Sequence, residues 1–257
     1  MVHIDLNSDS GESFGSWNMG DDAAMMRIVS SANIACGYHA GDPSVMRTTC
    51  TAAVANNVTI GAHVAYPDLP GFGRRFIDMT PTELTDAVIY QIGALQAVAA
   101  LAGGKVSYVK PHGGLYNTIV HHEAQAQAVA TAIAELNRAS GTNLSLLCLP
   151  GSVVVEKSQK AGVEVFYEAF ADRGYTSQGT LVSRREADAV IHDPVQVAAR
   201  VVKMALEKKV IAADGTEVAL DAHSVCVHGD TAGAVGIARA VRAALEVEGV
   251  QISAFSV

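Results

Sequence analysis

Four histidines stand where short apolar runs of the chain come to an end. They are His39 in CGYHAGDP, His63 in GAHVAYPD, His112 in VKPHGG and His228 in VHGD. Histidine exchanges protons near neutral pH and binds divalent metals, yet one such residue alone is often structural. Four in the same context predict a shared site for acid–base or metal chemistry.

Carboxylate and amide side chains occupy the same kind of position in the sequence. Aspartate with two or three histidines is a typical ligand set for zinc or another ion that activates water. Without a metal, the same groups form an acid–base network in which a carboxylate orients an imidazole. The motif HExxH is absent, and the residues alone leave both chemistries open. The members that follow apolar runs are Asn7, Asp9, Glu12, Glu168 and Asp230.

Cationic side chains accompany these groups. GFGRR places Arg74 and Arg75 next to one another, and Lys110 comes two residues before His112. Adjacent residues of an extended segment point in opposite directions, so we expect one arginine to face a ligand and the other to be structural. Guanidinium groups bind carboxylates and phosphates. In a chain of net charge −8, local cations of this kind indicate an anionic substrate.

Several common catalytic motifs are missing. The sequence has no GxxxxGK[ST] phosphate loop, no GxGxxG after a strand and no GxSxG nucleophile motif. Cys36, in ACGYH, could be a nucleophile, but a buried and inert thiol is the more common role of such a residue.

Composition excludes other classes of protein. The chain has 257 residues, of which 49% are hydrophobic and 17% charged, and its pI is near 5.5. It has no basic footprint for nucleic acid and no lysine-rich run for an anionic membrane. The N-terminus lacks the pattern of a secretory signal. The longest apolar stretch, AVIYQIGALQAVAALA, is interrupted by Gln91 and Gln96 and predicts no membrane span.

The four cysteines are widely separated and form no CxxC pair. This spacing predicts reduced thiols and a cytoplasmic protein. No linker or break in composition divides the chain, so we expect a single domain over residues 1–257.

Short β-rich runs alternate with longer helical patterns. Thr80-Pro81 with Glu83 forms a capping box, and Asp42-Pro43 and Asp193-Pro194 are further helix starts. Nearly continuous apolar strands in alternation with helices predict a parallel sheet, and seven or eight such units favour a closed, TIM-like (β/α) barrel. In a barrel, the carboxyl ends of the strands meet on one face. The expected strands are VHIDLN, SANIAC, VTIGAHV, VSYVKP, LSLLCL, EVFYEA, SVCVHG and QISAFSV.

Six stretches, in this order, resemble the LamB/YcsF family: DLNSDSGESFG, NIACGYHAGDP, GAHVAYPDLPGFGRR, VKPHGGLYN, EAFADRGY and CVHGDT. They span residues 5–231, which is nearly the whole chain. The family usually has cysteine where Ser8 stands here, so that cysteine is not an indispensable nucleophile. None of the departures falls on the acidic, histidine or arginine positions named above.

The resemblance implies an irregular (β/α)7–8 barrel related to glycoside hydrolases and polysaccharide deacetylases. It also implies the role of a 5-oxoprolinase A subunit: ATP-dependent opening of 5-oxo-L-proline to L-glutamate, together with partner subunits B and C. ATP, with magnesium, would then be handled by the assembly, in keeping with the missing phosphate loop. A divalent metal on this subunit would be held by Asp9, His39, His63 and His112.

Residue roles follow as hypotheses. We expect Asp9 or Glu12 to be the base, His39, His63 and His112 to carry protons or hold metal, and Arg74 or Lys110 to bind the substrate carboxylate. Two alternatives remain, a stand-alone metal-dependent deacetylase or amidohydrolase and a non-catalytic subunit that only binds substrate. The further substrate-binding candidates are Asn7, Glu168, His228 and Asp230.

Overall fold

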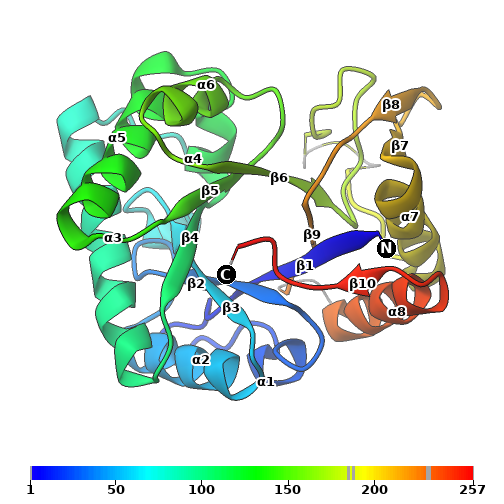
Figure 1. Ribbon diagram of the computed structural model, residues 1–257, viewed down its shortest axis with the longest axis horizontal. Helices are drawn as coiled ribbons and strands as arrows, with labels where there is room; N and C mark the ends of the chain where they lie inside the picture. Colours follow the sequence, from blue (N-terminus) through cyan, green and yellow to red (C-terminus); the bar gives the residue numbers. More distant parts are fainter. Residues whose placement is uncertain (1, 184–185, 187–188, 230–232, 257) are drawn as a thin grey trace.

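Seven parallel strands close into a barrel in the computed structural model, which describes residues 2–183, 186, 189–229 and 233–256. Strand β9 pairs with both β6 and β1, and this double pairing closes the ring (Figure 1). The TIM-like α/β barrel expected from the sequence is therefore confirmed. The strands of the ring are β1 (His3–Ser10), β2 (Ser31–Ala35), β3 (Thr59–Val64), β4 (Val106–Pro111), β5 (Ser145–Cys148), β6 (Val165–Phe170) and β9 (Ser224–Cys226).

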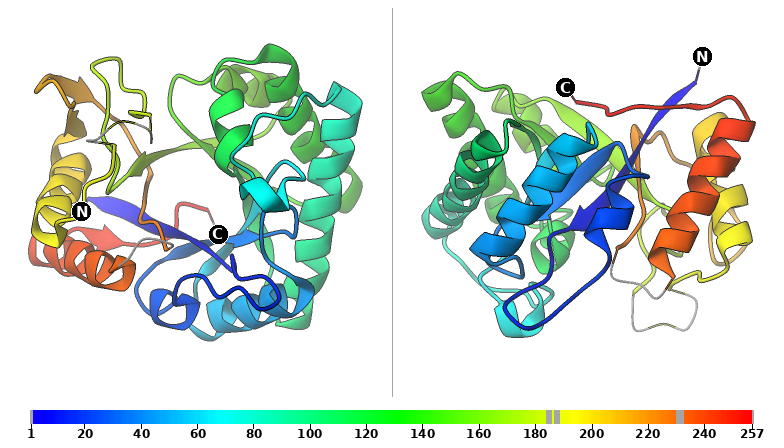
Figure 2. Two further views of the ribbon diagram at one scale, coloured as in Figure 1. Left: turned by 180° about the vertical axis from the view of Figure 1, so that it is seen from behind. Right: turned by 90° about the horizontal axis from the view of Figure 1, so that it is seen from below.

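Helices surround the barrel on its outer side (Figure 2). Their start signals act as the sequence predicts: the Thr80 hydroxyl accepts from the Glu83 N–H, while the Glu83 carboxylate accepts from Thr80. Asp42 and Asp193 cap the helices that begin at the prolines after them. The helices are α1 (Asp22–Met25), α2 (Pro43–Ala55), α3 (Pro81–Leu101), α4 (Gly113–Thr118), α5 (Glu123–Ser140), α6 (Val153–Lys160), α7 (Pro194–Glu207) and α8 (Ala234–Val247), with a 3-10 turn, η1, at Leu69–Gly71.

The last third of the chain departs from simple alternation. Between β6 and β9 it forms an antiparallel hairpin of β7 (Lys209–Ile211) and β8 (Glu217–Ala219), which the sequence did not predict. Three-residue strands are too short to show a period of two. At the C-terminus only β10 (Gln251–Ile252) is a strand, paired with the first residues of β1, so the predicted longer strand is wrong.

Helix α3 has 21 residues and is apolar enough, by length and composition alone, to cross a membrane. The expectation that this stretch does not span a membrane stays a prediction. Its buried side chains, including Leu84, Val88 and Leu95, lie at helical spacing and face the barrel. Gln91 is buried among them, where it bonds to both the N–H and the carbonyl of Ala65. A core helix of a barrel gives the same composition.

The barrel interior beneath the carboxyl ends is polar. Asn33, on β2, donates to Asn7 and Asp9 at 2.7 and 2.8 Å, and the buried Tyr108 hydroxyl donates to Asn33 at 2.7 Å. Gly61 on the neighbouring strand leaves the space that the Tyr108 ring fills, because a Cβ there would overlap the ring. These bonds hold the Asn7 and Asp9 side chains of β1 in place from the barrel interior.

Candidate active site

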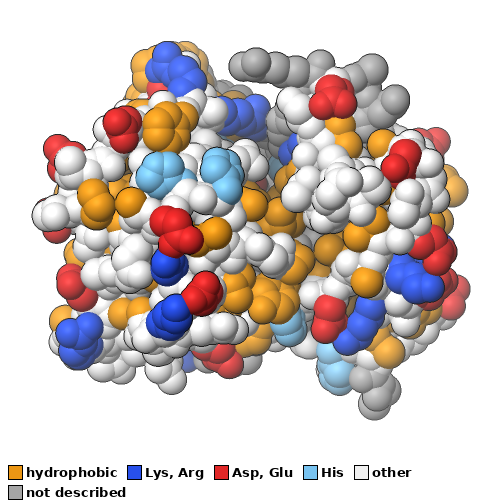
Figure 3. Space-filling view, turned by 90° about the horizontal axis from the view of Figure 1, so that it is seen from above, with side chains coloured by type: hydrophobic (Ala, Val, Ile, Leu, Met, Phe, Trp, Pro, Cys, Tyr) orange, Lys and Arg blue, Asp and Glu red, His pale blue; other side chains and the backbone are white. Residues whose placement is uncertain are grey.

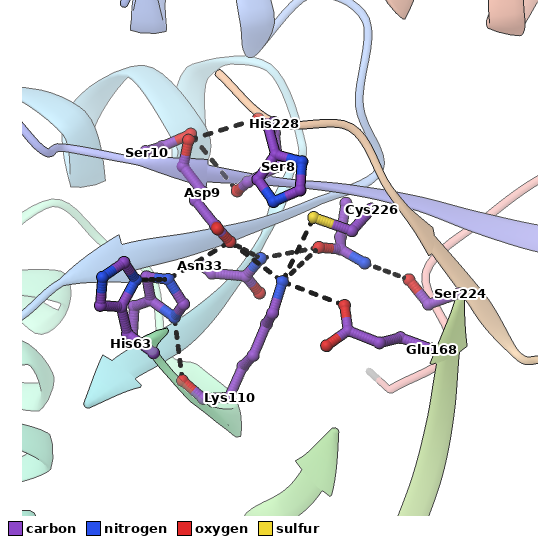
Figure 4. A network of polar contacts seen from close by, with 12 residues as sticks. Ser8, Asp9, Ser10, Asn33, His63, Lys110, Glu168, Ser224, Cys226 and His228 are labelled. Carbon is purple, nitrogen blue, oxygen red and sulfur yellow. Dashed lines mark hydrogen bonds and ion pairs between the residues drawn. The ribbon is translucent and has the colours of Figure 1, made fainter. Parts of the chain in front are cut away.

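The Lys110 ammonium lies at the centre of the polar network (Figure 4). It is 2% exposed and lies 3.0 Å from both Asp9 and Glu168. The Cys226 sulfur is 3.3 Å away and the Asn7 oxygen 3.4 Å. Strands β1, β4, β6 and β9 each supply one or more of these groups. Lys110, near the end of β4, thus joins carboxylates from β1 and β6, two strands that are separated in the ring by β9.

The pKa values of this pair follow from its surroundings. Burial alone would lower the pKa of Lys110, but Asp9, Cys226 and Glu168 raise it well above its usual range. Burial alone would raise the pKa of Asp9, but His63 and Lys110 hold it well below its ordinary value. Asp9 therefore stays ionised and is a weak proton acceptor.

Three histidines and a glutamate form a second group beside Asp9. His63 lies on β3, whereas Glu12, His39 and His112 lie just beyond strands β1, β2 and β4. His39 contacts Glu12 at 3.0 Å and stacks on His112 with ring centroids 3.8 Å apart. One donor atom from each of the four residues lies within 4.8 Å of all the others. Burial lowers the pKa of His39 and of His112 well below the usual range, which favours neutral rings.

The backbone selects the tautomers of two of these rings. His63 Nδ1 lies 2.9 Å from the Lys110 carbonyl, and His112 Nε2 lies 2.9 Å from the Phe72 carbonyl. A carbonyl only accepts, so both nitrogens carry protons. The remaining nitrogens, His63 Nε2 and His112 Nδ1, are 3.0 Å apart, and His63 Nε2 also lies 3.3 Å from the Asp9 carboxylate. A shared proton or a cation between the two nitrogens would satisfy both.

Glycines allow the loops to pack this closely. Gly41 has φ +80°, and a Cβ there would come within 3.0 Å of Gly11 and Ala35. Gly73, at φ +63°, lies against His39 and His112, so a side chain at that position would displace the rings. These positive φ values favour glycine and explain why glycines accompany the histidines in the sequence.

A histidine–aspartate pair stands at another part of the same rim. His228 Nδ1 lies 2.8 Å from Asp172, and its ring stacks on Phe170 with centroids 5.6 Å apart. An aspartate bound to Nδ1 fixes the orientation and the tautomer of the ring. Of the four histidines, three are grouped with Glu12, while His228 pairs with Asp172.

The group of Glu12 and three histidines and the His228–Asp172 pair both border a cavity of about 490 Å³. That volume is within the range of about 300–1,000 Å³ common for small-molecule sites. Cations, ionisable groups and apolar surface all contribute to its wall. The lining includes Asp9, Glu12, His63, Arg74, Lys110, His112, Tyr116, Phe170, Arg173, Leu181, Ser183 and His228.

The adjacent arginines have separate surroundings. Arg75 forms an ion pair with Asp68, while Arg74 lies over the Phe72 ring, 4.8 Å from its centroid, and lines the cavity. Asp68 is thereby a structural residue, as is Asp42 at its helix cap. Cys36 is buried and its Sγ contacts the Ile34 carbonyl at 3.2 Å, and burial raises its pKa.

Most of the candidate residues converge, with some changes of grouping. Glu12, rather than Asp9, completes the group of three histidines. Asn7 and Glu168 are fully buried under the cavity, and Asp230 lies outside the described residues. Sequence reasoning overlooked Asn33, Tyr116 and Cys226. Cys226 directly precedes VHGD, but an apolar strand with a cysteine gives no signal of a cation beside it.

The fold and this rim define a parallel (β/α) barrel with a buried acid–base site at its carboxyl end. Comparison with known structures agrees with the barrel fold. The polysaccharide deacetylase Bc1974 of Bacillus cereus shares the fold, with a TM-score of 0.50 at 10% identity, over 99% of this chain and 92% of that one.

The model of the LamB/YcsF family matches residues 4–257, and the chain belongs to this family. It is 59% identical to the 5-oxoprolinase A subunit of Kocuria rhizophila over 256 residues, which is 100% of both chains. The lactam utilization protein of Thermus thermophilus superposes with a TM-score of 0.92 at 43% identity, over 99% of this chain and 100% of that one.

Proposed function

We propose that the protein is the A subunit of a 5-oxoprolinase and that its cavity opens the lactam ring of 5-oxo-L-proline to give L-glutamate. End-to-end similarity to the Kocuria rhizophila relative of that name carries the proposal. Hydrolysis of a lactam requires activated water, stabilisation of the carbonyl oxygen and a proton for the ring nitrogen. The cavity contains groups suited to each task.

We assign water activation to the group of Glu12, His39, His63 and His112. The neutral rings of His39 and His112 and the Glu12 carboxylate can accept a proton, whereas Asp9 is held ionised by its neighbours. Asp9 would instead stabilise positive charge that develops on the histidines. His228, held by Asp172, would deliver the proton to the ring nitrogen.

Substrate binding is assigned to the cationic and apolar parts of the wall. Arg74 at the cavity edge would bind the substrate carboxylate, with Phe170 and Leu181 against the ring. Lys110 is already engaged by two carboxylates, so we give it, with Asn7 and Glu168, the role of positioning Asp9.

The reaction is proposed to depend on ATP and on partner subunits B and C. The lactam oxygen would attack the γ-phosphorus, and ADP would leave. Water then adds to the imidate-like carbon, and the C–N bond breaks as the nitrogen is protonated. The product is an acyl phosphate, which a second water hydrolyses to glutamate and phosphate. Magnesium would accompany ATP on the assembly.

The donor set of the histidine group fits a divalent ion. Three imidazoles and one carboxylate are typical zinc ligands, and a bound cation would suit the nitrogens of His63 and His112 that face one another at 3.0 Å. Such an ion would activate water by lowering its pKa, in place of proton transfer to these side chains. We therefore propose Glu12, His39, His63 and His112 as the holders of such an ion. Elemental analysis of the protein and of His39→Ala tests this: a stoichiometric metal in the first and its loss in the second are expected.

The decisive experiment measures glutamate release from 5-oxoproline by the chain alone and with its partner subunits, with and without ATP. Turnover that requires both ATP and the partners is the expected result. Glutamate release by the chain alone without ATP would instead assign the stand-alone amidohydrolase. No turnover in any mixture of folded and active subunits would refute the proposal.

Variants separate catalysis from mere binding. Glu12→Gln and His112→Ala should abolish turnover while 5-oxoproline binding persists, whereas Lys160→Met, on the exposed face of α6, should behave as the parent protein. If both site variants turned over normally in the assembly, the non-catalytic binding subunit would be the better description.

A further inference from the structure

The Asp9 carboxylate contacts the described part of the chain through only one of its two oxygens. Asn33 Nδ2 donates to Oδ1 at 2.8 Å, and Lys110 Nζ donates to the same oxygen at 3.0 Å. His63 Nε2 lies 3.3 Å from Oδ1 as well. Figure 4 shows these side chains around Asp9. Three contacts at one oxygen fix the orientation of the whole carboxylate.

The second oxygen, Oδ2, borders the cavity. None of the described residues donates a hydrogen bond to it, and it is not one of the fully buried polar atoms. The Asp9 side chain is 11% exposed and lines the cavity of about 490 Å³. Oδ2 is therefore an acceptor that the protein holds in place and that a ligand can reach.

The charges around Asp9 favour a ligand group that is a donor or a cation. Lys110 is one ammonium between two carboxylates, Asp9 and Glu168, so negative charge exceeds positive charge within this group of three. Glu168 is fully buried, and only Asp9 borders the cavity. On the face of the molecule over the β7–β8 hairpin, by contrast, acidic and basic side chains are interspersed (Figure 3).

His228 stands close enough to Asp9 for both to contact one ligand atom. One of its ring nitrogens lies within 4.8 Å of a carboxylate oxygen of Asp9, and both residues line the cavity. Two hydrogen bonds that meet at one atom span at most about 6 Å. A single nitrogen of a ligand can therefore lie between the Asp9 acceptor and the His228 ring.

We propose that Asp9 Oδ2 recognises the nitrogen of the substrate. It accepts a hydrogen bond from the ring N–H of the lactam and, after ring opening, from the ammonium group of the product. The inference rests on the proposed function, since it assigns a partner to the nitrogen of that substrate. Asp9 is then a specificity-determining residue for lactams with a free N–H, and His228 contacts the same nitrogen.

The nitrogen carries a hydrogen for Oδ2 at each stage of the proposed reaction. Attack of the lactam oxygen on phosphorus leaves the N–H in place and shifts positive charge onto the nitrogen. When the C–N bond breaks and the nitrogen is protonated, the product carries an ammonium group. Hydrogen bonds between charged partners are roughly twice as strong as neutral ones. The contact therefore strengthens as charge develops, which lowers the barrier to ring opening.

Isothermal titration calorimetry on the full chain tests the inference with two pairs of ligands. L-glutamate and glutarate differ in the ammonium group alone. 5-Oxo-L-proline and the matching γ-lactone differ in the ring N–H, which is an oxygen in the lactone. We expect the parent to bind the nitrogen-containing member of each pair about tenfold or more tightly. This comparison requires no variant.

Two variants assign the preference to Asp9. Asp9→Asn replaces the carboxylate by a neutral amide of the same shape and should remove most of the preference. Asp221→Asn takes a carboxylate from an exposed ion pair with Lys208 and should leave the preference unchanged. The ratio of the two affinities is the readout, because a general distortion of the cavity would weaken both ligands alike. Thermal unfolding checks that Asp9→Asn is folded.

The outcomes separate this inference from the proposed function. Equal affinities within both pairs, which a water molecule at Oδ2 would predict, overturn the inference, as does an unchanged preference in Asp9→Asn or no binding of either nitrogen ligand to the parent. If the assembly then still turns over 5-oxoproline, the proposed function stands. A glutamate preference that Asp9→Asn removes, without turnover in any mixture of active subunits, would keep the nitrogen site and refute the proposed function.

Discussion

Replacement of Lys110 by methionine tests the central claim about the barrel interior, that one buried cation holds two carboxylates. Methionine keeps most of the side-chain volume, so the change removes charge more than packing. Asp9 and Glu168 would remain, and no described residue donates a hydrogen bond of good geometry to either Glu168 oxygen. The ion pair with Lys110 is what compensates that charge.

The magnitude follows from the two distances of 3.0 Å. With an effective dielectric constant of about 20, Coulomb's law gives about 5.5 kcal/mol for each contact, and the cost of dehydrating the ions offsets much of it. Breaking a buried pair by removing one partner costs about 3–5 kcal/mol. We expect the free energy of unfolding to fall by that amount at neutral pH.

The loss should depend on pH in a defined direction. In the parent, the lowered pKa of Asp9 gives stability that is present at neutral pH and lost as pH falls below its unfolded pKa near 3.8. Lys110→Met removes one cause of that lowering. The difference between the two proteins should therefore shrink as pH falls below about 4.

Urea unfolding at pH 7.5 and pH 3.0, followed by circular dichroism, measures both effects. Lys160→Met, which breaks an exposed pair with Glu156, is the control and should leave the midpoint unchanged. A loss below about 1 kcal/mol at pH 7.5, the value of an exposed pair, would refute the reasoning. So would a loss that grows on acidification.

Three further predictions concern the residues that support the site. Burial raises the pKa of Asp5 to about 6, so the folded protein loses stability as pH rises from about 4 to above 6 and Asp5 ionises. Asp5→Asn should remove up to about 3 kcal/mol of this pH dependence, measured by urea unfolding. Gly41→Ala should lower the free energy of unfolding by about 2 kcal/mol or more, because of the positive φ and the contacts its Cβ would make, and an unchanged urea midpoint would contradict this. Tyr108→Phe leaves the Asn33 oxygen without its 2.7 Å donor and should cost about 1–3 kcal/mol, measured as a shift in thermal midpoint against Tyr90→Phe on the exposed face of α3.

Local sequence signals predicted the elements well where their physics is local. A capping box depends on two residues three positions apart, and Thr80 with Glu83 forms one in the structure. The strand VSYVKP has the bounds that its apolar pattern predicts. The β7–β8 hairpin was missed because three-residue strands leave too short a pattern.

The histidines were expected on one face because parallel strands in a barrel bring their carboxyl ends together. That argument does not say which rim residues touch. Glu12 reaches His39, and His228 meets Asp172, through loops whose paths depend on positive φ values and close packing. The single-domain expectation and the residue roles stay predictions.

By itself the sequence determined the alternation of strands and helices, the helix starts and the set of polar residues on the rim, because each depends on neighbours along the chain. Only the tertiary structure decided that Lys110 joins Asp9 to Glu168 and that backbone carbonyls fix the tautomers of His63 and His112. Protonation and charge balance depend on which groups share a low-dielectric space. Residues far apart in the chain come to share that space only when the barrel closes.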